Sequence, residues 1–202
     1  MRYCTLRAEP QPLSFWQDLR IYAGRMREFN PTDWLVYVLW IGLMLGLFLS
    51  VSGFLALGLS RGVVFPDYVW IIPIGIFLFV ASIALDTIGH RTIYQQELRK
   101  GESLVHGITI FCGIGSVVAL VAAYAKPGFF WIPAACLTGL SVLYSLIDEA
   151  LHWLRYFQHK SDRVEMWSHF GILFGHSLMM TGWWVWFSQG YPGVAQTLGQ
   201  GL

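Results

Sequence analysis

Charged residues and cysteines are scarce in this chain. Only 12% of its 202 residues are Asp, Glu, Lys or Arg, whereas a soluble domain carries about 25%. The three cysteines Cys4, Cys112 and Cys136 lack the paired spacing of a zinc or redox motif, so we expect free thiols and no disulfide. The net charge is +1 and no Lys- and Arg-rich motif is present. The sequence therefore predicts no nucleic-acid partner.

Hydrophobic runs take up most of the chain, in which 55% of residues are hydrophobic. Each run is long enough to cross the hydrocarbon core of a bilayer, which takes about 20 apolar residues. The runs cover about 34–59, 67–90, 104–125, 130–154 and 166–188. Because the backbone in lipid must satisfy its own hydrogen bonds, the runs are expected to be helices. The predicted fold is an all-α integral membrane bundle of about five transmembrane helices.

The chain divides into three regions by composition. Residues 1–30 form a polar N-terminal segment, in which 13–28 has the pattern of a helix on a membrane surface or of a helix that docks on a partner. Asn30-Pro31-Thr32-Asp33 is a helix-start signal. It opens a five-helix transmembrane domain at 31–190, and a short C-terminal tail follows at 191–202.

Positive charges are distributed unequally between the connections. Of the 13 Lys and Arg residues, only Arg61 and Lys126 fall on one side of the predicted membrane. The rest fall with the N-terminal segment and with the turns at about 91–103 and 155–164. The positive-inside rule places these in the cytoplasm. We expect an integral membrane protein, such as one of a bacterial inner membrane, with its N-terminus in the cytoplasm.

One polar motif occurs twice, each time where one apolar run ends and the next begins. It reads Asp-x3-His, a polar turn, then a second His: Asp86, His90 and His106 in the first copy, Asp148, His152 and His169 in the second. The two copies indicate a tandem repeat of a helical hairpin, and they lie at the same face of the membrane. Ionisable groups there are costly and are usually functional. The alternative is a set of polar caps at helix ends.

The Asp and the first His of each copy lie on one helix face because they are four residues apart. Each copy thus offers one carboxylate and two imidazoles. Three protein ligands with an open position suit a catalytic metal, and this ligand set favours iron or copper. We predict one or two such ions, held by halves of one polar centre. Zinc or heme b is a less favoured cofactor.

Further polar groups accompany the second copy. Glu149 precedes His152 by three residues, Glu165 precedes His169 by one turn, and His176 follows it by two turns. These three are candidate catalytic groups, as additional ligands or proton carriers. Glu165 could instead favour the start of its helix, and His176 could be a core histidine.

The favoured function is a membrane metalloenzyme, or the metal-bearing subunit of one, that activates O2 to oxidise a small or lipidic apolar substrate. A zinc-dependent membrane hydrolase would use the same residues. A heme b or quinone-binding electron-transfer anchor would need two facing histidines. A non-catalytic membrane interaction protein would need none of these groups.

At these motifs the chain resembles the third of the three subunit types of the copper membrane monooxygenases, the particulate methane and ammonia monooxygenase family. DTIGHRTIYQQ…LVH is similar to its Asp-x3-His…His copper site, with His90 to Ile93 as the most specific stretch. DEALHW…WSHFGILFG is similar to its Asn-x3-His…His site on the next hairpin. The resemblance covers roughly 65–202, including the tail FSQGYPGVAQTLGQGL.

The resemblance implies a copper site that activates O2 within a complex with other membrane subunits. Its first site would be Asp86, His90 and His106, and its second Asp148, His152 and His169. Both turns are slightly longer than those of the family, and the chain departs from it in three further ways. Asp148 stands where the family has Asn, the acidic Pro-containing strings of the family's turns are missing, and the charge pattern puts the sites on the cytoplasmic side whereas the family has them toward the periplasm.

Overall fold

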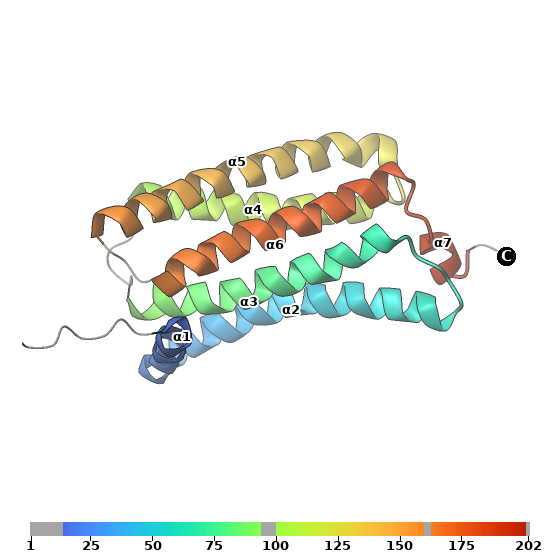
Figure 1. Cartoon of the computed structure of the whole chain (residues 1–202). Helices are drawn as coiled ribbons and strands as arrows, with labels where there is room; N and C mark the ends of the chain where they lie inside the picture. Colours follow the sequence, from blue (N-terminus) through green and yellow to red (C-terminus); the bar gives the residue numbers. More distant parts are fainter. Residues whose placement is uncertain (1–13, 94–99, 160–162, 201–202) are drawn as a thin grey trace, which may run out of the picture.

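Five long helices run side by side in the computed structural model, which describes residues 14–93, 100–159 and 163–200 (Figure 1). They are α2 (Pro31–Ser60), α3 (Ile71–Thr92), α4 (Lys100–Ala123), α5 (Pro127–His159) and α6 (Arg163–Ser188). Four short elements complete the fold: α1 (Phe15–Gly24), η1 (Arg25–Glu28), η2 (Asp67–Trp70) and α7 (Val194–Thr197). Every described element is helical, so the predicted all-α class is confirmed.

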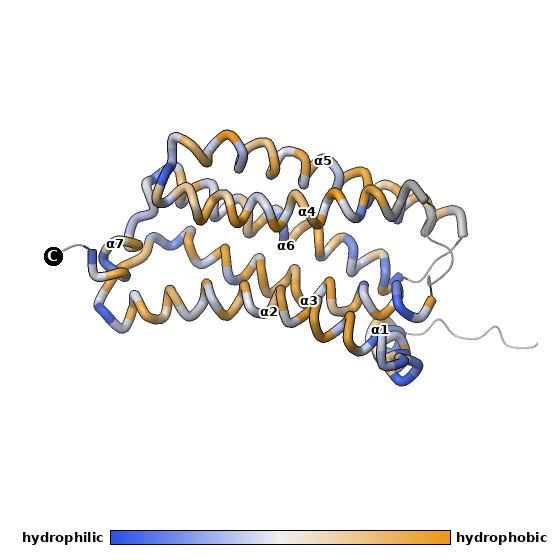
Figure 2. The backbone as a smooth tube through the Cα atoms, turned by 180° about the vertical axis from the view of Figure 1, so that it is seen from behind, coloured by the Kyte–Doolittle hydropathy of each residue, from blue (hydrophilic) through white to orange (hydrophobic). Residues whose placement is uncertain are grey.

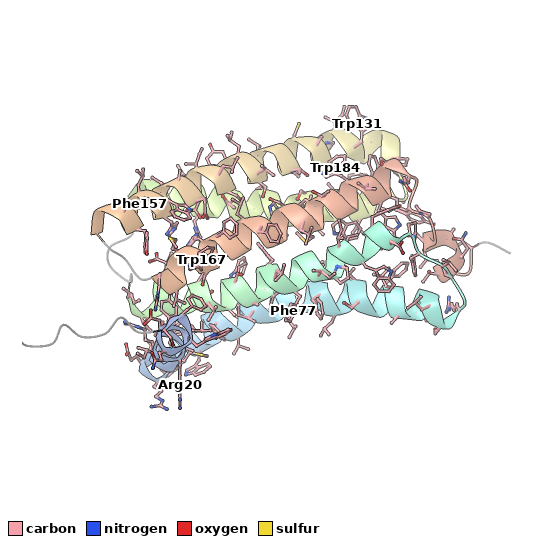
Figure 3. The ribbon with its side chains drawn as sticks, in the orientation of Figure 1. Arg20, Phe77, Trp131, Phe157, Trp167 and Trp184 are labelled. Atoms are coloured by element: carbon pink, nitrogen blue, oxygen red, sulfur yellow. The ribbon has the colours of Figure 1, made fainter. Side chains whose placement is uncertain are left out.

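Four segments are long and apolar enough to cross a membrane: 31–60, 67–92, 104–123 and 127–154. Figure 2 shows hydrophobic residues along these helices and hydrophilic residues gathered toward the ends, most of all around α1. Large side chains such as Phe77, Trp131 and Phe157 are exposed and point away from the bundle (Figure 3). A soluble monomer rarely exposes apolar surface on this scale. The fold is therefore a membrane-type bundle.

The fifth long helix, α6, is not among these four segments. It packs against α3, α4 and α5, and its buried side chains include His169, His176, Met179 and Trp183. A helix that faces protein rather than lipid can carry imidazole and indole groups, because these groups are then kept away from the hydrocarbon. The predicted span at 166–188 thus corresponds to a helix with one face buried in the bundle and another, with Trp167, Phe170 and Phe174, exposed.

Two glycines allow α3 and α6 to approach closely. A Cβ on Gly75 would lie 2.5 Å from the backbone nitrogen of Met179, and a Cβ on Gly175 would lie 2.6 Å from that of Phe79. No larger side chain fits at either position without moving a backbone. Small residues at helix contacts are how membrane helices pack when lipid supplies no hydrophobic driving force.

The helices do not pack in the pairs that the tandem repeat predicts. The most extensive contacts join α3 with α6 and α4 with α5, whereas the consecutive helices α3 and α4 do not pack against each other along their described residues. Around the bundle the order is α2, α3, α6, α5, α4, and α2 does not contact α4 within the same residues. The tandem hairpin repeat stays a prediction.

Polar contacts organise the end of the bundle that carries α1. Asn30 caps α2, with Pro31 in its first turn and Asp33 completing the capping box, as the helix-start signal predicts. The Nε of Arg91, on α3, donates to Asp33 Oδ1 at 2.7 Å. Asp18 of α1 is ion-paired with Arg163 of α6. These contacts fix the start of α2 and α6 beside the end of α3.

The helix predicted within residues 13–28 forms as α1, with Trp16 and Ile21 exposed. At the opposite end of the bundle, the C-terminal tail packs as α7 against α2. The Arg61 guanidinium donates there to the carbonyl of Thr197, whose side chain is fully buried.

Candidate metal centre

Both copies of the motif lie at the α1 end of the bundle. Their residues come from four helices, because α3 and α5 end there and α4 and α6 begin there. Asp86 and His90 lie on α3, His106 on α4, Asp148 and His152 on α5, and His169 on α6. All are buried except His90 and His106, which are partly exposed.

Each copy brings its three predicted ligands together. In the first copy, one ligand atom each from Asp86, His90 and His106 lies within 4.8 Å of the other two, and the same holds for the second copy. His90 Nε2 is 3.4 Å from Asp86 Oδ2. Each set is thus compact enough to hold one ion.

The two copies also contact each other. His169 Nε2, from the second copy, lies 2.8 Å from Asp86 Oδ1 of the first. His106 Nδ1, from the first copy, lies 3.2 Å from Asp148 Oδ2 of the second. The rings of His152 and His169 stack with centroids 3.3 Å apart. These cross-contacts follow from the packing of α3 on α6 and of α4 on α5, and they make the six residues one centre.

The spacing of these atoms fits metal ligation. Ligand atoms around a single ion, with bonds of about 2.0–2.2 Å, stand about 3–4 Å apart, which is the range of most of the Asp–His separations. Among the described residues, the buried atoms Asp86 Oδ1, Asp148 Oδ1 and His169 Nε2 lack a hydrogen bond of acceptable geometry. Although His169 Nε2 is close to Asp86 Oδ1, the two atoms are not aligned as donor and acceptor. Because the two atoms are only 2.8 Å apart, an ion that binds both would lie to one side of the line between them.

Glu165 lies beside the centre and orients one of its imidazoles. It is buried in the first turn of α6, and its Oε1 is 3.2 Å from His152 Nδ1. A carboxylate on the far nitrogen of a ligating histidine fixes the ring and raises its basicity. The position also favours the helix start, so both predicted roles of Glu165 are compatible with the structure.

Glu149 is buried but does not join either ligand group. Its Oε1 accepts a hydrogen bond of 2.6 Å from Trp153 Nε1, one turn along α5. Sequence patterns predict no role for Trp153, although its spacing from Glu149 is that of helix neighbours. Glu149 therefore stays a candidate proton carrier beside the centre.

His176 lies apart from the other histidines, two turns further along α6. It is buried, its Nε2 is 3.4 Å from Ser141 Oγ, and its ring lies against Phe79. Within the described residues its Nδ1 has no hydrogen-bond partner. Ser141 was not predicted, because a serine in an apolar helix carries no distinctive signal.

A cavity of about 540 Å³ connects His176 with the centre. Its polar wall includes Asp86, His106, Asp148, His169 and His176. The rest of its lining is mainly apolar and comes from all five long helices. The volume lies in the range of small-molecule sites, about 300–1,000 Å³.

The close packing of the imidazoles favours a small ion over a heme. His152 and His169 are stacked in contact, and the centroids of His90 and His106 are 5.1 Å apart with tilted rings. A macrocycle between two axial histidines would have to separate such rings.

No protein-family model matches this chain, and comparisons with curated proteins and with solved structures find no similar protein. The resemblance to the copper membrane monooxygenases therefore stays a prediction from the sequence.

Proposed function

We propose that this chain is a membrane metalloenzyme, or the metal-bearing subunit of a larger oxidase complex, that uses O2 to oxidise an apolar substrate. The observation that carries the proposal is the union of two Asp/His sets in one largely buried centre, four of whose six residues line an apolar cavity. Such a site holds ions next to a space that excludes bulk water.

The residues of the chain have distinct parts in this proposal. Asp86 and Asp148 are the anionic ligands. The imidazole ligands are His90, His106, His152 and His169. Two carboxylates and four imidazoles can hold one or two metal ions. Ligands of these two types together favour copper or iron. When bound, the ions supply the redox chemistry that activates O2.

The reaction balances as R–H + O2 + 2 electrons + 2 protons giving R–OH + H2O. One C–H bond is replaced by C–O–H, and the second oxygen atom leaves as water. The two electrons come from a separate donor, for which a membrane-soluble quinol is the fitting chemical class. In this proposal Glu149 and Glu165 carry protons toward the centre, and the burial of both beside it supports this part.

The apolar lining of the cavity supports an oxygenase over a hydrolase. Hydrolysis needs water and a polar leaving group at the site, whereas C–H oxidation needs an apolar substrate held next to the ions. Apart from the polar wall, most of the lining is Leu, Ile, Val, Met and Gly.

Metal analysis together with an optical spectrum of the purified chain tests the proposal. We expect one or two copper or iron ions per chain and no Soret band. A Soret band would identify a heme protein, zinc alone a hydrolase, and a chain without metal after loading with either ion an interaction protein. Each of these three results contradicts the proposal.

A further inference from the structure

We propose that the cavity binds the aliphatic chain of a membrane lipid, which reaches it sideways through the gap between α2 and α4. This inference rests on the proposed function and names its substrate class as long-chain lipids. The carbons nearest the polar end of the lipid then lie beside the metal centre.

The gap is a feature of the helix packing. The five long helices form an incomplete ring in which α2 contacts α3 but, along the described residues, not α4. Both helices nevertheless line the cavity, α2 with residues between Trp40 and Ser50 and α4 with residues between His106 and Val118. The cavity is thus open on the side that faces the bilayer.

Small residues on α2 keep this opening wide. Gly42, Gly46 and Ser50 follow each other at one-turn spacing and all line the cavity. A Cβ on Gly42 or Gly46 would have no atom within 4 Å. The Ser50 hydroxyl is turned back to the carbonyl of Gly46, at 2.7 Å, so it presents no free polar group to the opening.

The residues at the opening are ones that lipid chains contact favourably. Leu43, Ile114 and Val118 line the cavity and are 54%, 39% and 62% exposed. Because no charged residue of α2 lines the cavity, an aliphatic chain can pass from the bilayer into it without desolvating a charge. A polar substrate from water would have no such path here.

The long axis of the cavity sets which part of the chain meets the ions. On α4 the lining extends from His106, in the polar centre, to Val118, about 18 Å further along the helix at 1.5 Å per residue. The centre lies near the helix ends, and the other limit lies toward the middle of a hydrocarbon core about 30 Å thick. A lipid keeps its polar end at the interface, so its first carbons face the centre.

The buried His176 offers a polar contact to a ligand in the cavity. Its imidazole lines the cavity about two turns from the centre, and its Nδ1 has no hydrogen-bond partner among the described residues. A lipid that already carries an oxygen in mid-chain would find a polar contact there.

Photolabelling of the full chain in phosphatidylcholine vesicles tests the inference. One probe is a long-chain fatty acid with a diazirine next to its carboxyl group, and a second has the diazirine next to its terminal methyl. We expect the first to label the His106–Ile110 region and the second to label the region of Val117 and Val118. Phosphatidylcholines with the same two chains form a parallel arm, and the arm that labels identifies the lipid source.

Matched variants on α2 make the test specific. Gly46→Leu fills the opening and should lower labelling about tenfold, which corresponds to about 1.4 kcal/mol. Gly53→Leu is the control, because Gly53 also has no atom within 4 Å of an added Cβ but lies beyond the cavity on the same helix. If Gly46→Leu does not fold, Val118→Trp blocks the opposite wall.

Equal labelling of Gly46→Leu, Val118→Trp and wild type would overturn the inference. So would an exchange of the regions that the two diazirine probes label, or an absence of labelling with both the fatty acids and the phosphatidylcholines. The metal content of the same samples separates the two proposals. Normal metal without cavity labelling contradicts only the lipid path, whereas cavity labelling without metal contradicts only the proposed function.

Discussion

Each aspartate of the centre faces histidines from both copies of the motif. Asp86 lies near His90 of its own copy and His169 of the other, and Asp148 lies near His152 of its own copy and His106 of the other. Neither copy is therefore an independent site. A change at either aspartate should disturb ligands on both sides of the centre.

Glu165 gives the sharpest prediction at the scale of single residues. Glu165→Gln keeps the shape of the side chain but removes the carboxylate beside His152 Nδ1. Loss of a carboxylate that orients a ligating histidine lowers metal affinity about 10–100-fold. Competition with a chelator measures the affinity. Glu149→Gln is the control, since Glu149 is buried but outside both ligand groups. Equal affinities of Glu165→Gln and wild type would contradict the role given to Glu165.

The six residues of the centre were predictable from their spacing in the sequence, but the contacts between the two copies were not. Asp and His four apart on a helix, next to a turn and another His, identify the six residues and require no tertiary knowledge. The Asp86–His169 and His106–Asp148 contacts depend on which helices pack together. The contacts of Trp153 with Glu149 and of Ser141 with His176 were not predicted. Both depend on the directions in which the side chains point, which the sequence does not give.

At the scale of elements, the contact between α3 and α6 should be sensitive to small added volumes. Gly75→Ala and Gly175→Ala each place a methyl group against backbone atoms of the other helix. Overpacking of this kind costs about 1–3 kcal/mol, which titration with a denaturing detergent in mixed micelles measures as a loss of unfolding free energy.

Gly139→Ala is the matched control for these variants, because a Cβ at Gly139 on α5 meets no atom within 4 Å. Its stability should equal or slightly exceed that of wild type, as alanine favours helix over glycine. If Gly175→Ala were as stable as Gly139→Ala, the close approach of α3 and α6 would be wrong.

The long helices were predictable from the lengths of the hydrophobic runs, and the start of α2 was predictable from its capping signal. The burial of one face of α6 was not, because a run of 20 or more largely apolar residues looks the same whether it faces lipid or protein. Its histidines and tryptophans were the available signal. Which helices pack together was not predictable either. The close contacts of Gly75 and Gly175 belong to the packing of α3 on α6, and the sequence does not show which helix a glycine will face.

At the scale of the whole molecule, the charge distribution predicts orientation. Arg27 and Ser60 lie at opposite ends of the bundle and are both exposed. In a chain whose three native cysteines are replaced, a membrane-impermeant maleimide added to intact cells should label Ser60→Cys and spare Arg27→Cys. The reverse pattern would place the centre on the outer side, where the copper membrane monooxygenases carry theirs.

The bound metal of four preparations tests the central claim most directly. Wild type, His90→Ala and His152→Ala are purified after loading with copper or iron, and the ions per folded chain are counted. His159→Ala, outside both motif copies, is the control and should match wild type. If the two copies form one centre, each of the two single variants loses most of its bound metal. Metal content equal to wild type in both variants would contradict the account.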